Sequence, residues 1–331
     1  MQTAESGGTS APGTTGSVGR GKRSLKMAIR KGVVSVGAPL IRAYMQSPVH
    51  WGKRPFWERI GERFFWQHLP FETKTEFGAI IRGNTGDFIP SAIYYFGVWE
   101  PHLTRFIQDR LLPGDVFVDV GANIGYYTLW ASKLTGSTGS VVAIEASARI
   151  YQTLLEHLEL NHAGNVRAVH CAVSDAEGVL PVFTGPGYNL GRTTTVPKED
   201  QPTSEGEVRA APLASLLSED EMARARIVKV DVEGAEWAVA QGMRRLLSAC
   251  RKELEIVIEV SPSRLAEQGH SVAEIFELFL SHGFRAYRLE NDYEMISYVP
   301  PVAHKPIVRI AHTDVTEQMD IVFSRADRAS L

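Results

Sequence analysis

The 331-residue chain is poor in cysteine and has no long apolar run. Its two cysteines, Cys171 and Cys250, have no Cys or His neighbour at metal-ligand spacing, so we expect neither a metal site nor a disulfide framework. No segment reaches the roughly 20 apolar residues that a membrane-spanning helix needs. No apolar block with a small-residue cleavage site follows the first basic cluster, as a secretory signal would require. These absences favour a globular protein in the reducing cytoplasm.

Charge is unevenly distributed along the chain. Residues 1–70 contain 11 Lys and Arg and 3 Asp and Glu, a net charge of +8, whereas the remainder contains 24 and 35, a net charge of −11. We expect residues 1–19, which are rich in Gly, Ser and Thr, to be a disordered tail. Residues 20–75 are predicted to be a basic, aromatic helical extension. Within it, an amphipathic helix is expected over residues 24–46, with breaks at Gly32, Gly37 and Pro39.

Residues 20–66 of this extension have two interpretations. The first is a cap that packs on the main domain and leaves its cationic side chains in water. The second is weak contact with an anionic membrane surface, because aromatic residues such as Trp51 and Trp66 lie among lysines and arginines. This second interpretation would place a cytoplasmic protein at the inner face of a membrane. No nucleic-acid partner is expected, and the oligomeric state is left open.

From residue 76 to residue 331 the pattern predicts one α/β domain. Strands are expected at 77–81, 92–96, 116–120, 141–144, 166–173, 227–230, 255–260, 284–289 and 319–323. Helices are expected at 102–112, 126–134, 150–160, 235–247 and 272–281, and residues 184–207 are turn-rich. Near-continuous apolar strands that alternate with helices are typical of a parallel sheet covered on both faces. We therefore predict a Rossmann-like fold, with a mostly parallel seven-stranded sheet built from the strands after residue 115.

The strongest local signal is the turn after the strand at 116–120. Gly121 permits a sharp turn there and a close ligand approach, and Gly125 permits close packing of the next helix. Asn123 replaces the second glycine of the dinucleotide-binding fingerprint. Asp119, two residues before Gly121, would repel a pyrophosphate but suits a ligand with a cationic aminoacyl end. These departures count against a nicotinamide cofactor.

Acidic residues follow other strands of the predicted sheet. Glu145 ends the second strand, where a carboxylate can accept hydrogen bonds from ribose hydroxyls. Asp231, Glu233 and Glu259 are expected at the same carboxyl edge, where three carboxylates need a cation, a shared proton or hydrogen-bond donors. Small residues at 171–175 leave room for an adenine ring. Glu236 is expected to cap the following helix.

These stretches together resemble the FkbM-like family of S-adenosylmethionine-dependent methyltransferases. The resemblance spans roughly residues 90–290 and rests on FVDVGANIGYYT, VVAIEASARIYQTLLEHLELN, VHCAVSD, IVKVDVEGAEWAVAQGM, IVIEV and HGFRAYRL. It implies a class I methyltransferase fold and S-adenosylmethionine as cofactor. The cofactor contacts expected on this basis are Glu100, Asp119, Gly121, Ala122, Asn123, Gly125, Tyr126, Thr128, Glu145, Ala146, Ala172, Val173 and Asp231.

The resemblance also implies methyl transfer to a hydroxyl of a sugar, a glycan or another small metabolite. Asp231 is our first choice for the base that removes the hydroxyl proton, with Glu233 and Glu259 as the other catalytic candidates. Two alternatives remain at this point. One is a nicotinamide-dependent oxidoreductase or epimerase, and the other is a non-catalytic cofactor-binding scaffold at a membrane surface.

Overall fold

The computed structural model describes residues 32–196, 203–291, 293–300, 302 and 305–331. The predicted tail at 1–19 and the start of the helix predicted over 24–46 lie outside these residues. Residues 32–45 are helical without a break, so the interruptions expected at Gly37 and Pro39 are wrong. Gly37 is accommodated because the helix packs closely on Phe64, whose ring would lie 2.7 Å from an added Cβ.

The main sheet has eight strands in the order β12-β11-β13-β10-β9-β3-β4-β5. The strands are, from one edge to the other, β12 (Val308–Arg309), β11 (Arg285–Leu289), β13 (Met319–Ser324), β10 (Glu255–Val260), β9 (Ala225–Val230), β3 (Val116–Val120), β4 (Ser140–Glu145) and β5 (Val166–His170). The five from β10 to β5 are parallel, and β13 is antiparallel to both of its neighbours. The mostly parallel sheet is confirmed with all seven expected strands, and the two-residue β12 extends it to eight.

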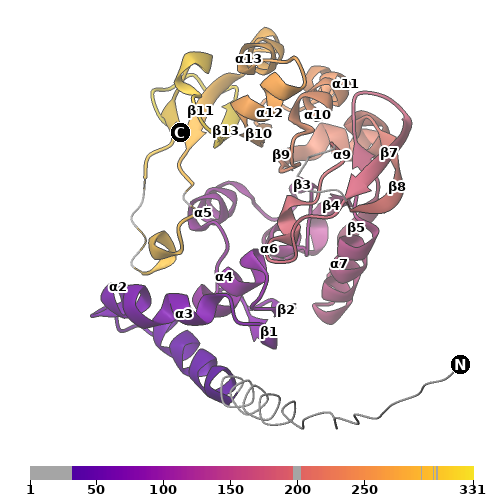
Figure 1. The fold of residues 1–331 in the computed structure, drawn as a ribbon. Helices are drawn as coiled ribbons and strands as arrows, with labels where there is room; N and C mark the ends of the chain where they lie inside the picture. Colours follow the sequence, from indigo (N-terminus) through magenta and orange to yellow (C-terminus); the bar gives the residue numbers. More distant parts are fainter. Residues whose placement is uncertain (1–31, 197–202, 292, 301, 303–304) are drawn as a thin grey trace, which may run out of the picture.

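Helices cover both faces of this sheet, as Figure 1 shows. One face carries Phe117, Val141 and Val257 and packs on α5 and α6, whereas Val116, Val118 and their neighbours pack on α10, α11 and α13. Alternate strand residues enter opposite cores because successive side chains of a strand point to opposite faces. The helices are α4 (Phe88–Phe96), α5 (Pro101–Arg110), α6 (Tyr126–Thr135), α7 (Ala148–Leu160), α8 (Leu213–Leu216), α9 (Glu219–Arg224), α10 (Glu236–Gly242), α11 (Arg244–Ala249), α12 (Pro262–Glu267) and α13 (Val272–Ser281). Single turns are formed by η2 (Gly136–Thr138), η3 (Leu190–Arg192), η4 (Met295–Tyr298) and η5 (His312–Asp314).

Several segments differ from the expected pattern. The strand expected at 77–81 is shifted to Ile80–Asn84. The strand expected at 92–96 is wrong, because the segment belongs to helix α4, which is buried nearly all round and therefore shows no clear period. The strand expected at 166–173 divides into β5 and β6 (Ala172–Val173). β6 joins β7 (Gly178–Phe183) and β8 (Ser204–Ala211) in a small three-stranded sheet that the turn-rich composition concealed. The helix expected at 235–247 is interrupted between α10 and α11, where Gly242 lies against the backbone of Ser174.

The N-terminal extension packs into the main core. It contains α2 (Lys53–Phe56), the π-helical turn η1 (Trp57–Gly61), α3 (Glu62–Phe65) and the strand β1 (Pro70–Lys74), which forms a hairpin with β2 (Ile80–Asn84). The Trp57 ring is fully buried and contacts the rings of Phe65, Tyr95 and Phe96. The hairpin crosses the domain boundary predicted at residue 75, and that boundary stays a prediction. None of the helices in the described residues is long and apolar enough to cross a membrane.

The burial of Trp57 gives a test of the extension's structural role. Trp57→Ala should lower the free energy of unfolding by about 3–5 kcal/mol, the usual cost of removing a buried aromatic side chain. Trp51→Ala is the matched control, because 88% of Trp51 is exposed and its removal leaves no cavity. Urea unfolding followed by circular dichroism measures both. Equal stability of the two variants would contradict the shared core.

Candidate active site

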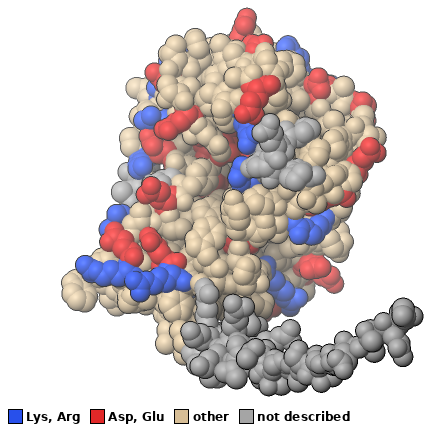
Figure 2. Space-filling view, in the orientation of Figure 1, with Lys and Arg blue, Asp and Glu red and all other residues tan. Residues whose placement is uncertain are grey.

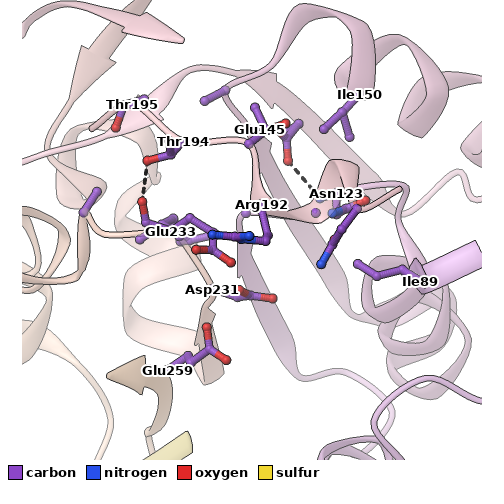
Figure 3. A pocket seen from close by; sticks show the side chains of 18 of the residues that line it. Ile89, Asn123, Glu145, Ile150, Arg192, Thr194, Thr195, Asp231, Glu233 and Glu259 are labelled. Atoms are coloured by element: carbon purple, nitrogen blue, oxygen red, sulfur yellow. Dashed lines mark hydrogen bonds between the residues drawn. The ribbon is translucent and has the colours of Figure 1, made fainter. Parts of the chain in front are cut away.

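A cavity of about 470 Å³ lies at the carboxyl edge of the parallel strands. It opens where the strand order reverses, between β3 and β9, which is where ligands bind in open α/β sheets. Its volume is in the range of small-molecule and cofactor sites. Figure 3 shows Glu145, Asp231 and Glu259 around it, which come from β4, the end of β9 and β10, together with Ile89 and Arg192 of the lining.

The turn after β3 is held to both neighbouring strands. The amides of Gly121 and Ala122 donate to the carbonyl oxygen of Ile144, and the amide of Asp231 donates to Val120. Gly121 has a φ of +76°, and a Cβ there would lie 1.9 Å from the Asp231 carbonyl oxygen. Only glycine fits here, because it adopts a positive φ readily and has no Cβ to collide with the end of β9.

Glu145 joins this turn to the end of β4. Its two carboxylate oxygens accept hydrogen bonds from the amides of Asn123 and Ser147, each at 2.9 Å. The first of these bonds is the dashed line beside Asn123 in Figure 3. Burial raises the pKa of Glu145 to about 7 despite these donors. A carboxylate has about four acceptor positions, so Glu145 can still bind ligand hydroxyls.

Lys229 is a buried cation beneath the cavity. Its Nζ lies 3.1 Å from an Asp231 oxygen and 3.7 Å from an Asp119 oxygen, and the Thr128 hydroxyl donates to the second Asp119 oxygen at 2.6 Å. Burial alone would lower the Lys229 pKa, but the carboxylates of Asp231 and Asp119 outweigh it and raise that pKa. Lys229 therefore stays charged. Asp231, whose side chain is 38% exposed, lines the cavity above it.

Three further carboxyl groups surround Asp231. Burial, together with the charges of Asp320 and Asp231, raises the pKa of Glu100 to about 8, even though the Tyr127 hydroxyl donates to it at 2.5 Å. Burial raises the pKa of Asp320 to about 6 and raises that of Glu259 well above its ordinary value. The site therefore holds protons near neutral pH that isolated carboxylates would have lost.

The predicted site residues divide into two groups. Ten line the cavity, and they are Glu100, Gly121, Asn123, Glu145, Ala146, Ala172, Val173, Asp231, Glu233 and Glu259. The other five lie behind it, and they are Asp119, Ala122, Gly125, Tyr126 and Thr128. Asp119 is fully buried in its pair with Lys229, so the cationic ligand end expected to meet it has a lysine in its place. Direct ligand contacts from these five stay predictions that the cavity lining does not support.

Several residues of the site were not predicted from the sequence. Lys229 could have been predicted from the sequence, because it is the one charged residue in the apolar run 227–230. It lies two positions before Asp231, on the same side of the strand. Asp320 faces Glu259 across antiparallel strands, and that pairing requires knowledge of the strand order. Tyr293, whose hydroxyl donates to Glu259, comes from a loop. Glu236 lies in the first turn of α10 but forms no side-chain cap of this helix; it accepts from the amide of Gly234, before the helix, at 2.8 Å.

Comparison with known families matches the strands that form this site. Residues 119–286, half of the chain, match the model of the methyltransferase FkbM domain. The chain belongs to the FkbM methyltransferase family. Membership confirms the resemblance found in the sequence, and it implies S-adenosylmethionine as the methyl donor, as expected.

Individual relatives are distant. The chain is 31% identical over 162 residues to methyltransferase sdnD of Sordaria araneosa, covering 40% of this chain and 62% of that protein. It is 26% identical over 197 residues to the hexuronic acid methyltransferase AglP of Haloferax volcanii, covering 58% and 78%. It is also similar to the crystal structure of methyltransferase FkbM from Methylobacillus flagellatus, with 14% identity and a TM-score of 0.40. The match covers 70% of this chain and 53% of that chain. The chain spans 62% and 59% of the length of two curated relatives that it matches.

The raised carboxyl pKa values predict how stability depends on pH. A carboxyl whose pKa is higher in the folded chain contributes stability below its unfolded pKa and loses it as the pH rises through the folded value. With folded pKa values of about 8 for Glu100 and about 7 for Glu145, the free energy of unfolding should fall between about pH 5 and pH 8. Each extra bound proton contributes about 1.4 kcal/mol per pH unit.

Glu100→Gln tests this dependence, because glutamine resembles the protonated acid and does not titrate. Urea unfolding of the ligand-free protein across this pH range should give a flatter dependence for the variant. Glu207→Gln, at an exposed position of β8, is the control and should follow the unmodified protein. An identical slope in Glu100→Gln would show that Glu100 does not carry the proton.

Proposed function

We propose that this chain transfers the methyl group of S-adenosylmethionine to a hydroxyl of a sugar, a glycan or another small metabolite. The observation that carries the proposal is the Asp231 carboxylate, which lines the cavity at the strand switch point while Lys229 holds one of its oxygens. Family membership favours this reaction over the nicotinamide-dependent alternative. A scaffold without activity would have no need for this set of buried acids.

The cavity lining fits a cofactor that carries both a ribose and positive charge. Glu145 offers acceptors for the ribose hydroxyls, and the small side chains of Ala146 and Ala172 leave space for a flat ring beside them. Asp231 supplies negative charge for the cationic part, with the Glu100 carboxyl group also in the lining. The bound cofactor supplies an activated methyl group. The residues of this chain bind and orient the cofactor and the acceptor, and they remove the proton of the acceptor hydroxyl.

The remaining wall of the cavity suits a sugar-like acceptor. Aromatic rings from separate segments line it, and they are Trp66, Phe88, Trp99, Tyr188 and Tyr293. Such rings bind the apolar faces of small ligands, while their polar edges and the neighbouring Arg192 and Arg264 offer hydrogen bonds. The relative AglP, named as a hexuronic acid methyltransferase, is consistent with this acceptor class.

Asp231 is proposed as the residue that accepts the proton of the acceptor hydroxyl. Lys229 engages one Asp231 oxygen at 3.1 Å and so fixes the carboxylate in one orientation. A base within hydrogen-bond reach of the hydroxyl can take its proton as the new bond to carbon forms. Glu259 is the weaker candidate, because its side chain is buried and already accepts a hydrogen bond from the Tyr293 hydroxyl.

The cofactor half of the site is tested by Glu145→Ala. Loss of a charged hydrogen bond should weaken S-adenosylmethionine binding by about 1–3 kcal/mol, measured by calorimetry. Because Glu145 also holds the Asn123 turn, Glu145→Gln is the matched variant that keeps the shape. Unchanged affinity in folded Glu145→Ala would remove Glu145 from the ribose role.

The catalytic half is tested by Asp231→Asn. General-base catalysis contributes about 10²–10⁴-fold, so turnover should fall at least about a hundredfold while the protein stays folded. Asp109→Asn, which removes an exposed carboxylate on α5, is the control and should keep normal turnover. Mass spectrometry of a deletion strain, searching for a product lighter by one methyl group, would supply the acceptor.

Two outcomes would contradict this assignment. Near-normal turnover of Asp231→Asn would exclude it as the base and direct attention to Glu233, which also lines the cavity. A large rise in the cofactor dissociation constant, with turnover preserved at saturation, would make Asp231 a binding residue.

A further inference from the structure

The first described helix turns an apolar side outward. Residues 32–45 pack on the body through Ala38, Ile41 and Met45, which are buried. On another side of the helix, Val33, Val36 and Leu40 are 55%, 65% and 66% exposed. Their spacing of three and four residues aligns them along one stripe. Apolar residues on both sides of a surface helix indicate that the outer side has a partner.

The apolar surface continues into the turn that follows the helix. Val49 is 54% exposed and Trp51 is 88% exposed, so a large ring stands out from the molecule. The turn is tied back to the helix, because the Tyr44 hydroxyl donates to the Trp51 carbonyl oxygen at 2.6 Å. Gly52, at a φ of +76°, then directs the chain into α2. Tryptophan at such a position is typical of residues that sit between an apolar phase and water.

Positive charge borders this apolar surface. Residues 20–31, which precede the helix in the sequence, contain six Lys and Arg and no Asp or Glu. After the helix, Arg54, Arg59 and Arg63 are exposed, with Glu58 and Glu62 among them. Figure 2 shows a run of basic side chains at the lower left, over the α2–α3 segment. The chain beyond residue 70 has a net charge of −11 and would be repelled by the same anionic partner.

We infer that residues 32–51 are a docking surface for an anionic phospholipid bilayer, on which Val33, Val36, Leu40 and Trp51 enter the headgroup region. Apolar side chains with flanking cations are the combination that binds helices in the plane of such a membrane. A second copy of the chain fits less well, because residues 1–70 carry a net charge of +8 in each copy and would repel each other across the contact. This inference does not depend on the proposed methyl transfer.

The test is flotation of the full chain with vesicles of mixed phosphatidylglycerol and phosphatidylcholine. The unmodified protein should bind these vesicles more strongly than vesicles of phosphatidylcholine alone, and added salt should weaken binding by screening the cations. The double variant Val36→Asp/Leu40→Asp should bind at least about tenfold more weakly, because two apolar side chains that enter the headgroup region become charged. Trp51→Ala should weaken binding in the same direction.

The control variant is Val179→Asp/Leu112→Asp. These two residues are 61% and 65% exposed, which matches the tested pair, but they lie on β7 and after α5. The control should bind vesicles as the unmodified protein does, and thermal unfolding should be alike for all variants. Failure of the unmodified protein to float, or equal flotation of both double variants, would overturn the inference. So would a concentration-dependent dimer that only Val36→Asp/Leu40→Asp dissociates.

Discussion

The site depends on one buried cation. Lys229 lies between Asp119 at the end of β3 and Asp231 after β9, and without it the acids of these neighbouring strands would face each other with no counter-charge. Removing one partner of a buried ion pair typically costs about 3–5 kcal/mol, because the remaining charge has lost its solvation. The same cation also orients Asp231. One interaction therefore supports both the sheet edge and the group assigned to proton removal.

This arrangement explains why the carboxyl edge can hold so many acids. Asp119 is satisfied by Lys229 and Thr128, and Glu145 by two backbone amides. Glu100 and Glu259 have raised pKa values instead, chiefly because they are buried. The acids thus have three different solutions to burial, and Asp231 combines a cationic partner with exposure to the cavity. That difference supports Asp231 as the base better than its position in the sequence does.

The sequence predicts the parts of the site that follow apolar strands. Glu145, Asp231 and Glu259 could be assigned because β4, β9 and β10 are readable as buried runs, and their ends share one edge. The ion pair of Asp119 with Lys229 could not be predicted, since Lys229 lies on a strand that is distant in sequence and adjacent only in the folded sheet. Helix α4 was not predicted because it is almost completely buried, so its sequence shows no alternation of apolar and polar residues at helical spacing. The β7–β8 pair was not predicted because its strands are largely exposed and show no clear alternation either.

The family match and the cavity do not cover the same residues. Residues 119–286 include the turn after β3, Glu145 and Asp231, which form the side assigned to the cofactor. The aromatic wall assigned to the acceptor comes largely from outside that range, where Trp66 of the extension stacks on Phe88 of α4 at a centroid distance of 5.8 Å. A shared half for the donor and a separate half for the acceptor would allow relatives to keep one chemistry while differing in substrate. We infer that acceptor choice in this chain is set mainly by the extension and α4, which lie outside the residues that match the family model.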